Sequence, residues 1–253
     1  MQAVRLNSGR FWAGTSGLVL SEPNKSAYPA EFRNKSRLSY YSSQFNSVEI
    51  NSSFYRLPMP ATFGKWAGEV GEEFRFTVKL ARDITHAKNF AYQPADLDRF
   101  MLAADRLDRK KGCLLIQLPP SLTDRAAGHL DELIRRIRTA DPQQSWKIAV
   151  EFRHPSWYWP GIYELLDKYL AGVVLQDMPA SATRDLNEKS PFVYLRFHGP
   201  AGDYKGGYTG EFLRQQAKDI KNWLREGKDV YAYFNNTIGD AVSNLAELNR
   251  LVN

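Results

Sequence analysis

The sequence has a single cysteine and no long hydrophobic run. Cys113 alone cannot form an intramolecular disulfide, and it lies in the apolar stretch CLLIQL, which is typical of a buried thiol. A chain of 253 residues can bury roughly 70–75% of its extended surface without a crosslink. The first residues, MQAVRLNSGRFWAG, lack the apolar core of a signal peptide, and no run reaches the ~20 apolar residues of a spanning helix. We therefore expect a soluble cytoplasmic protein that makes no membrane contact.

The motifs of several cofactor and nucleophile classes are also missing. The chain contains no GxGxxG sequence, no glycine-rich Walker loop and no arrangement resembling a nucleophile elbow. Its histidines form no HxH or HxxxH pair, so their spacing does not predict a metal site. We expect no cofactor. A divalent metal held by carboxylates and histidines from different strands is the alternative.

The charge balance is mildly basic. Lys and Arg total 34 against 28 Asp and Glu, a net charge of +6, while 25% of the residues are charged and 43% are hydrophobic. These values are ordinary for a globular protein, and they slightly favour an anionic partner, either a small substrate or a nucleic acid. The chain has no lysine block or basic tail of the kind found in non-specific nucleic-acid binders. The composition predicts no particular oligomeric state.

Strand-like and helix-like segments alternate along the whole chain. The strand-like runs are 10–17, 47–54, 75–81, 112–119, 147–154, 171–179, 192–199 and 229–236. Helical spacing is found at 96–109, 126–138, 160–169, 209–225 and 239–252, and more weakly at 34–44 and 60–69. The polar connection 180–190 shows little helical pattern. This order predicts an α/β fold, a (β/α)8 TIM-type barrel over residues 1–253 as a single domain, with a doubly wound open sheet as the alternative.

The strands carry polar side chains on one of their two faces. In FVYLRFHG, residues 192–199, the faces alternate between apolar residues and the set Tyr194, Arg196 and His198. If the apolar parity of each strand faces the helices, the polar parity faces the barrel axis. The residues then expected to point inward near the strand ends are Glu49, Asn51, Lys79, Gln117, Glu151, Arg153, Arg196, His198, Tyr233 and Asn235. In strand six, Gln176 and Asp177 have opposite parities, and we favour Asp177 as the inward residue.

This convergence of charge indicates a functional site. Barrel enzymes place their catalytic groups at the C-terminal ends of the strands, where these residues fall. Burying charges is costly, although the acidic and basic members would also balance in an internal network without a substrate. Because the opposite strand ends supply small or apolar residues, as in FWAGT and KIAV, we favour the functional interpretation.

Four residues are candidates for catalysis: Glu49, Glu151, His198 and Asp177. Glu49 and Glu151 would form a carboxylate pair in which burial raises one pKa and a neighbouring cation lowers the other. His198 would shuttle a proton, and it is favoured over His154 because it shares its parity with Arg196.

Eight further residues are candidates for substrate binding: Asn51, Lys79, His86, Gln117, Arg153, Trp157, Arg196 and Asn235. The arginines and Lys79 suit a phosphate or carboxylate. His86 lies on a loop over the same face. The rings near the strand ends would stack on a sugar or base, although packing explains Trp157 equally well. The loop 199–210, with five glycines, would form a mobile lid.

At these residues the sequence resembles the YecE-like family, known as domain of unknown function 72. The shared motifs are GTSG, FNSVEINSSFYRLP, FTVKLARDITH, LIQLPPS, AVEFRHPSW, YLRFHG and YFNNT. The resemblance implies a TIM-barrel-like fold and adds Thr85, His154 and Asn236 to the motif residues, but it implies no activity. One departure is LVLSEPNKSAYP after GTSG, where the family commonly has an aromatic-rich run.

Three functions remain open at this stage. The first is an enzyme, such as a hydrolase, that acts on an anionic substrate by acid–base chemistry. The second is a metal-dependent enzyme comparable to apurinic endonucleases or xylose isomerase, by analogy of fold and residue type. The third is a nucleic-acid or ligand-binding module without turnover.

Overall fold

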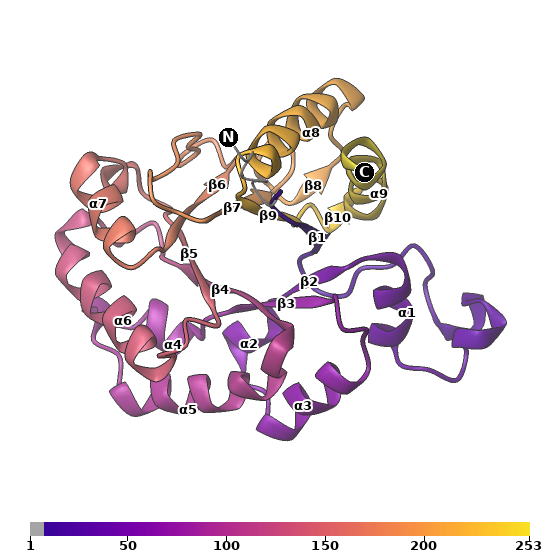
Figure 1. The fold of residues 1–253 in the computed structure, drawn as a ribbon, viewed down its shortest axis with the longest axis horizontal. Helices are drawn as coiled ribbons and strands as arrows, with labels where there is room; N and C mark the ends of the chain where they lie inside the picture. The colour runs from indigo at the N-terminus through magenta and orange to yellow at the C-terminus, as the bar shows by residue number, and fades with distance from the viewer. Residues whose placement is uncertain (1–7) are drawn as a thin grey trace, which may run out of the picture.

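Eight parallel strands form one sheet that curls into a barrel (Figure 1). The computed structural model describes residues 8–253 apart from the side chain of Asn89, and statements about residues 8–253 below exclude that side chain. The strands are β1 (Phe11–Thr15), β2 (Ser47–Ile50), β3 (Arg75–Lys79), β4 (Lys111–Gln117), β5 (Lys147–Glu151), β6 (Gly172–Gln176), β7 (Phe192–Phe197) and β9 (Asp229–Phe234). They are hydrogen-bonded in the order β1-β9-β7-β6-β5-β4-β3-β2. The predicted (β/α)8 fold is confirmed.

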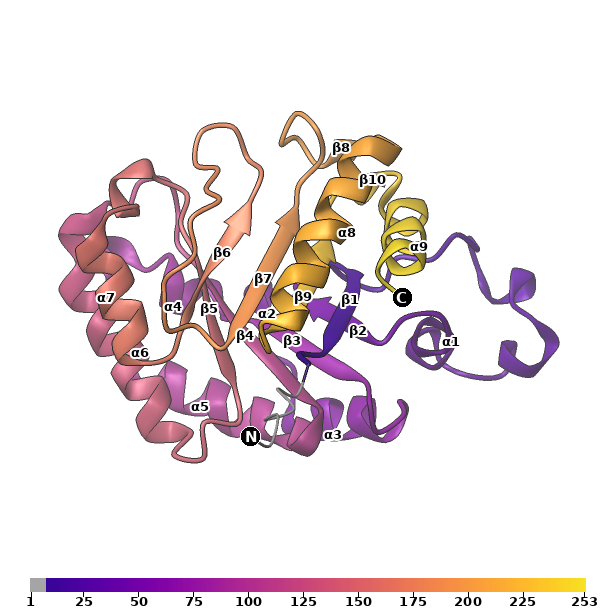
Figure 2. The same cartoon turned by 45° about the horizontal axis from the view of Figure 1, so that its top comes forward.

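Helices surround this barrel (Figure 1). They are α1 (Arg37–Gln44), α2 (Ser52–Tyr55), α3 (Pro60–Gly68), α4 (Arg82–Thr85), α5 (Pro94–Ala104), α6 (Ala127–Ala140), α7 (Pro160–Lys168), α8 (Gly210–Arg225) and α9 (Ala241–Val252). Residues 177–191, between β6 and β7, contain no helix, as their polar sequence predicts. In Figure 2 this connection rises beyond the strand tips. None of the helices in residues 8–253 combines the length and apolar character needed to cross a membrane.

Local sequence signals define where the helices begin. Pro60, Pro94 and Pro160 stand at the first turns of α3, α5 and α7, where the missing backbone N–H has no partner to lose. The side chains of Ser36 and Thr209 accept backbone hydrogen bonds at the starts of α1 and α8. The sequence therefore marks the starts of α1, α3, α5, α7 and α8.

Alternate residues of each strand enter two separate cores. The outward parity, such as Val48 and Val193, packs against the helices in one large cluster. The inward parity forms a second cluster inside the barrel, made of Trp12, Cys113, Leu115, Ala149, Val174, Phe192, Tyr194, Tyr231 and Tyr233. Trp12 stacks on Tyr231 with 4.9 Å between ring centroids. This apolar filling leaves the polar inward residues at the C-terminal ends of the strands.

The line between β1 and β2 is bridged largely by side chains. The Tyr41 hydroxyl accepts from the Thr15 backbone N–H at 2.7 Å and donates to the Ser47 carbonyl at 3.1 Å. Asn46 Oδ1 accepts from the Ala13 backbone N–H at 2.9 Å. We call this line the β1–β2 seam.

Candidate active site

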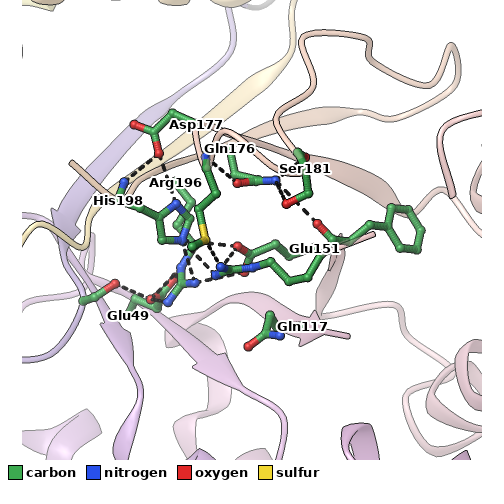
Figure 3. A network of polar contacts seen from close by, with 12 residues as sticks. Glu49, Gln117, Glu151, Gln176, Asp177, Ser181, Arg196 and His198 are labelled. Carbon is green, nitrogen blue, oxygen red and sulfur yellow. Dashed lines mark hydrogen bonds and ion pairs between the residues drawn. The ribbon is translucent and has the colours of Figure 1, made fainter. Parts of the chain in front are cut away.

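Arg196 is the centre of a buried ion network at the C-terminal ends of the strands (Figure 3). Its Nη2 donates to Glu49 Oε1 on β2 at 2.9 Å, and its Nη1 donates to Glu151 Oε2 on β5 at 2.9 Å. Arg196 is 2% exposed, and both carboxylates are fully buried. Three strands thus bring together one guanidinium and two carboxylates, as the parity of their sequences predicts.

Glu49 has a nearly complete set of hydrogen-bond donors. Besides Arg196, it accepts hydrogen bonds from the hydroxyls of Ser16 and Tyr194 and from Asn51 Nδ2 at 3.1 Å. Burial alone would raise the pKa of Glu49, but Arg196 and these hydroxyls lower it below its usual value. Burial also raises the pKa of the Tyr194 phenol, which keeps that donor protonated. Glu49 is therefore held as a carboxylate.

Glu151 is also held ionised. Its Oε1 lies 2.7 Å from Nη2 of Arg153 and 3.3 Å from Nε2 of His198. Burial opposes ionisation, but Arg196 and Arg153 hold the pKa of Glu151 well below its usual range. The expectation that one of the two carboxylates has a raised pKa is wrong, because each faces a guanidinium at close range, which outweighs burial.

His198 joins the network to Asp177. Asp177 Oδ1 accepts from the His198 backbone N–H at 2.8 Å and lies 3.1 Å from the ring Nδ1. On the other side of the ring, Nε2 lies 3.0 Å from Arg153 Nη2 and 3.1 Å from Arg196 Nη1. Because the Asp177 carboxylate can only accept, this contact assigns a proton to Nδ1, whereas Nε2 faces both the guanidinium groups and, at 3.3 Å, Glu151 Oε1.

Strand six differs in part from its prediction. Gln176, not Asp177, has the parity of Val174, which lies inside the barrel, and its register partner is Arg196. Its amide hydrogen-bonds to Ser181 in the following connection. Asp177 reaches His198 from just beyond the strand end, where the parity of the ladder no longer determines side-chain direction.

Lys79 is the inward residue at the end of β3, and it is 9% exposed. Its ammonium group has no hydrogen bond or ion pair among residues 8–253, and it lies 4.0 Å from the centroid of the Phe54 ring. Burial, followed by the positive charge of Arg196, lowers the pKa of Lys79 to about 8. The site thus contains a nearly buried cation without a counter-ion in direct contact.

His86 lies beside this lysine at the end of α4. Its ring packs edge-on against Phe54 with centroids 5.0 Å apart, and its Nδ1 lies 2.9 Å from the Thr85 hydroxyl. Burial, and then the charges of Lys79 and Arg82, lower the pKa of His86 to about 4. The predicted position of His86 over the strand ends agrees with these contacts.

Besides Glu151 Oε1, which is ion-paired with Arg153, two buried polar atoms at the centre of the site have no hydrogen-bond partner among the described residues. They are Asn51 Oδ1, an acceptor, and Arg153 Nε, a donor. Native proteins satisfy nearly all buried polar groups, so each orphaned atom needs an explanation. Together with Lys79, they offer two donors and one acceptor to a bound molecule.

Three predicted binding residues are not part of the ion network. Trp157 cannot contact a substrate here, because it is fully buried in the outer core, stacks on Phe152 and donates to the Leu122 carbonyl at 2.8 Å. Gln117 points at the site but hydrogen-bonds to the Leu118 carbonyl (Figure 3). Asn235 follows β9 with the parity of Tyr233 and is half-buried. The prediction for Trp157 is wrong because the chain beyond β5 turns into a short helix, and Trp157 on this helix does not point towards the barrel axis.

His154 has the structural role that its outward parity indicates. Its Nδ1 accepts from the backbone N–H of Ser156 at 3.2 Å and so caps the short helix that contains Trp157. The loop 199–210 is anchored by a small ladder in which β8 (Lys205–Gly206) pairs with β10 (Ile238–Gly239). Asp177 also accepts a hydrogen bond from the Tyr208 hydroxyl in this loop. These contacts fix the loop in place over His198.

Sequence reasoning missed several partners of the network. Ser16 and Met178 lie just after β1 and β6, where alternation carries no information, and they contact Glu49 and Arg153, respectively. Tyr208 lies in the loop 199–210 and contacts Asp177. The GTSG motif was the only available signal for Ser16. No group of three or more His, Cys, Asp or Glu that could hold a metal ion is found within residues 8–253.

Solved structures share this architecture. A DUF72 family protein of Thermotoga maritima superimposes with a TM-score of 0.75 at 24% identity, covering 96% of this chain and 99% of that one. A DUF72 family protein of Enterococcus faecalis gives a TM-score of 0.76 at 18% identity, covering 97% and 98% of the two chains. D-Psicose 3-epimerase gives a TM-score of 0.52 at 10% identity over 95% of both chains, a likeness of fold alone.

Curated proteins are similar in sequence. The UPF0759 protein YunF of Bacillus subtilis is 28% identical over 90% of this chain and 90% of its own length. The UPF0759 protein YecE of Escherichia coli K12 is 26% identical over 60% of this chain and 56% of its own length. The family model described as "Protein of unknown function DUF72" matches residues 12–253. With nearly all of its length matched, the chain belongs to the DUF72 family.

Proposed function

We propose that this protein is an enzyme that binds a small anionic substrate at the C-terminal end of the barrel and transforms it by acid–base chemistry. The observation that carries the proposal is Lys79, a nearly buried ammonium group without a direct partner among residues 8–253. A buried charge without a counter-ion is costly, and a substrate carboxylate or phosphate would offset that cost. Arg153 Nε, an unsatisfied donor, would contribute a second contact.

The arginines divide between two tasks in this proposal. Arg196 is occupied by Glu49 and Glu151, so it positions the carboxylates and does not bind substrate. Asn51 Oδ1 would accept a hydrogen bond from a hydroxyl or amino group of the substrate. A molecule that carries both an anion and such a donor fits this set of atoms.

The protonation states suit proton transfer. Glu151 is an ionised carboxylate and would act as the base. Lys79, with its pKa lowered to about 8, would return a proton near neutral pH. His198 is fully buried and would hold Arg153 in position. Hydrolysis of a phosphate ester and proton abstraction next to a carboxylate both belong to this class.

Anion binding is tested by thermal unfolding in increasing inorganic phosphate, with ionic strength held constant by sodium chloride. We expect a saturable rise in the unfolding temperature, since a ligand that binds only the folded state adds about 2.7 kcal/mol at 100 times its dissociation constant. Lys79→Met should lose this rise, whereas Lys218→Met, on the exposed face of α8, should keep it. A non-saturating rise common to all three proteins would contradict the proposal.

Turnover is tested with glycerol 3-phosphate and pyruvate. Phosphate release detects hydrolysis, and loss of the methyl proton signal of pyruvate in D2O detects proton abstraction. Either activity should disappear in Glu151→Gln, because an amide cannot accept the proton. Activity that survives this substitution would exclude Glu151 as the base.

A further inference from the structure

Lys79 differs from the other cations of the site in its surroundings. Arg196 and Arg153 each lie within 3 Å of a carboxylate oxygen, whereas Lys79 Nζ rests on the face of Phe54. A ring face is a weaker partner than a carboxylate and leaves the lone pair of a neutral amine free of hydrogen bonds. Lys79 also stands at the C-terminal end of a barrel strand, where barrel enzymes carry their reactive groups.

We infer that the Lys79 amine forms an imine with a small carbonyl compound that carries a carboxylate, of the 2-oxo acid class. This inference rests on the proposed anion site and names its substrate class. The substrate carboxylate would lie at Arg153 Nε, and its carbonyl carbon would face Lys79. The anion thereby brings the carbonyl group to the amine.

The covalent step balances without an oxidant or reductant. The amine lone pair forms a C–N bond to the carbonyl carbon as the C=O π bond breaks, and the carbonyl oxygen takes up one proton from the amine nitrogen and a second from solvent. Loss of that oxygen as water gives a protonated imine, so the neutral amine, the carbonyl compound and one solvent proton become the iminium and water. Its positive charge remains where the ammonium charge was, close enough to Glu151 and Glu49 for both carboxylates to act on the Lys79 charge.

The environment supports nucleophilic behaviour. The neighbouring guanidinium of Arg196 and burial both favour the neutral amine, which is the nucleophilic form. Phe54, which contacts Lys79, also lines a cavity of about 400 Å³ beside α2 and α5. Lys79 itself does not line this cavity, which reaches the amine only through the Phe54 ring.

The test is reductive trapping with pyruvate as the probe. The full-length protein is incubated with pyruvate and sodium cyanoborohydride at pH 7.5, digested and mapped by mass spectrometry. We expect the Lys79 peptide to be labelled on the order of 10-fold more than the peptide of exposed Lys65, because more of Lys79 is unprotonated. Equal labelling of the two lysines would overturn the inference.

Two controls separate this inference from the proposed function. Lys79→Arg keeps the cation but cannot form an imine, so it should retain phosphate stabilisation and lose the adduct. Acetone, which lacks the carboxylate, should label Lys79 on the order of 10-fold less than pyruvate, and equal labelling would overturn the 2-oxo acid assignment. Saturable phosphate binding by the unmodified protein without any Lys79 adduct would refute the imine and leave the anion site standing.

Discussion

Asp177 accepts two hydrogen bonds from His198, one from its backbone N–H at 2.8 Å and one from its ring at 3.1 Å. The double contact fixes the position of the ring and a proton on its Nδ1. As a result, Nε2 points towards the guanidinium groups of Arg153 and Arg196 and the carboxylate of Glu151. A carboxylate just beyond the end of β6 thus sets the orientation of a histidine just beyond the end of β7.

Asp177→Asn should release this tautomer. An amide can donate as well as accept, so protonation of Nδ1 is no longer enforced. The 15N chemical shifts of the His198 ring should show a protonated Nδ1 in the unmodified protein and a mixture of tautomers in the variant. Asp185→Asn, at an exposed position in the same connection, serves as the control. A ring with unprotonated Nδ1 in the unmodified protein would contradict the assignment.

Arg196→Met should be strongly destabilising. It leaves Glu49 and Glu151 buried without their common partner, and breaking a buried ion pair in this way costs about 3–5 kcal/mol. Urea denaturation at pH 7 measures the loss. The matched control is Arg135→Met, whose pair with Glu132 is solvent-exposed and is expected to contribute little. A second variant, Arg196→Met with Glu151→Gln, should recover part of the loss, because one uncompensated charge is removed.

The two central carboxylates should make the protein sensitive to acid. Because the pKa values of Glu49 and Glu151 are lowered by folding, their contribution is complete above the unfolded value of about 4.3. It is lost as the pH falls through the folded values. Glu151→Gln should be less stable at pH 7 and should lose less free energy of unfolding between about pH 5 and pH 3. An acid profile parallel to that of the unmodified protein would argue against a lowered pKa.

Lys79 should also make the stability rise with pH, but in the alkaline range. Its folded pKa of about 8 lies below the unfolded value near 10.4, so the unfolded chain binds more protons between these values. Stability should therefore rise with pH across this window, by on the order of 3 kcal/mol. The quantity to measure is the difference in unfolding free energy between the unmodified protein and Lys79→Met from pH 7 to pH 10.5. A difference that stays constant would mean that the lysine is not perturbed by folding.

His86 should respond to the charge of Lys79. Removing the ammonium in Lys79→Met should raise the pKa of His86 from about 4 towards its usual value, although burial will keep it lowered. Titration of the ring Cε1 proton by NMR measures the shift. Lys65→Met, which removes an equal charge from the exposed face of α3, should leave the His86 titration unchanged. An equal effect of both substitutions would contradict close contact between His86 and Lys79.

Alternation along the strands was enough to predict the barrel and the core of the site. Each buried strand shows its parity directly, so Glu49, Lys79, Glu151, Arg196 and His198 could be assigned inward from sequence alone. The charges gather at one end because all eight strands are parallel. This part of the prediction depends only on the two-residue repeat.

The rest of the site could not be predicted, because it depends on contacts that the alternation along the strands does not show. Asp177 and Trp157 lie beyond the ends of their strands, where the chain turns and parity is lost. The protonation states depend on distances between strands, so the pairing of both glutamates with Arg196 could not be read from spacing. Lys79 was grouped with the arginines as an anion binder because the sequence does not show which cations already have a carboxylate.

The β1–β2 seam determines where the ring of strands could widen. Backbone ladders resist opening at many points, whereas here a phenol and one amide hold the neighbouring edges together. At its upper end the seam terminates in the bridge between Ser16 and Glu49. Any widening of the barrel along the β1–β2 seam therefore displaces Glu49. The circumference of the barrel and the electrostatics at its opening are thus mechanically linked.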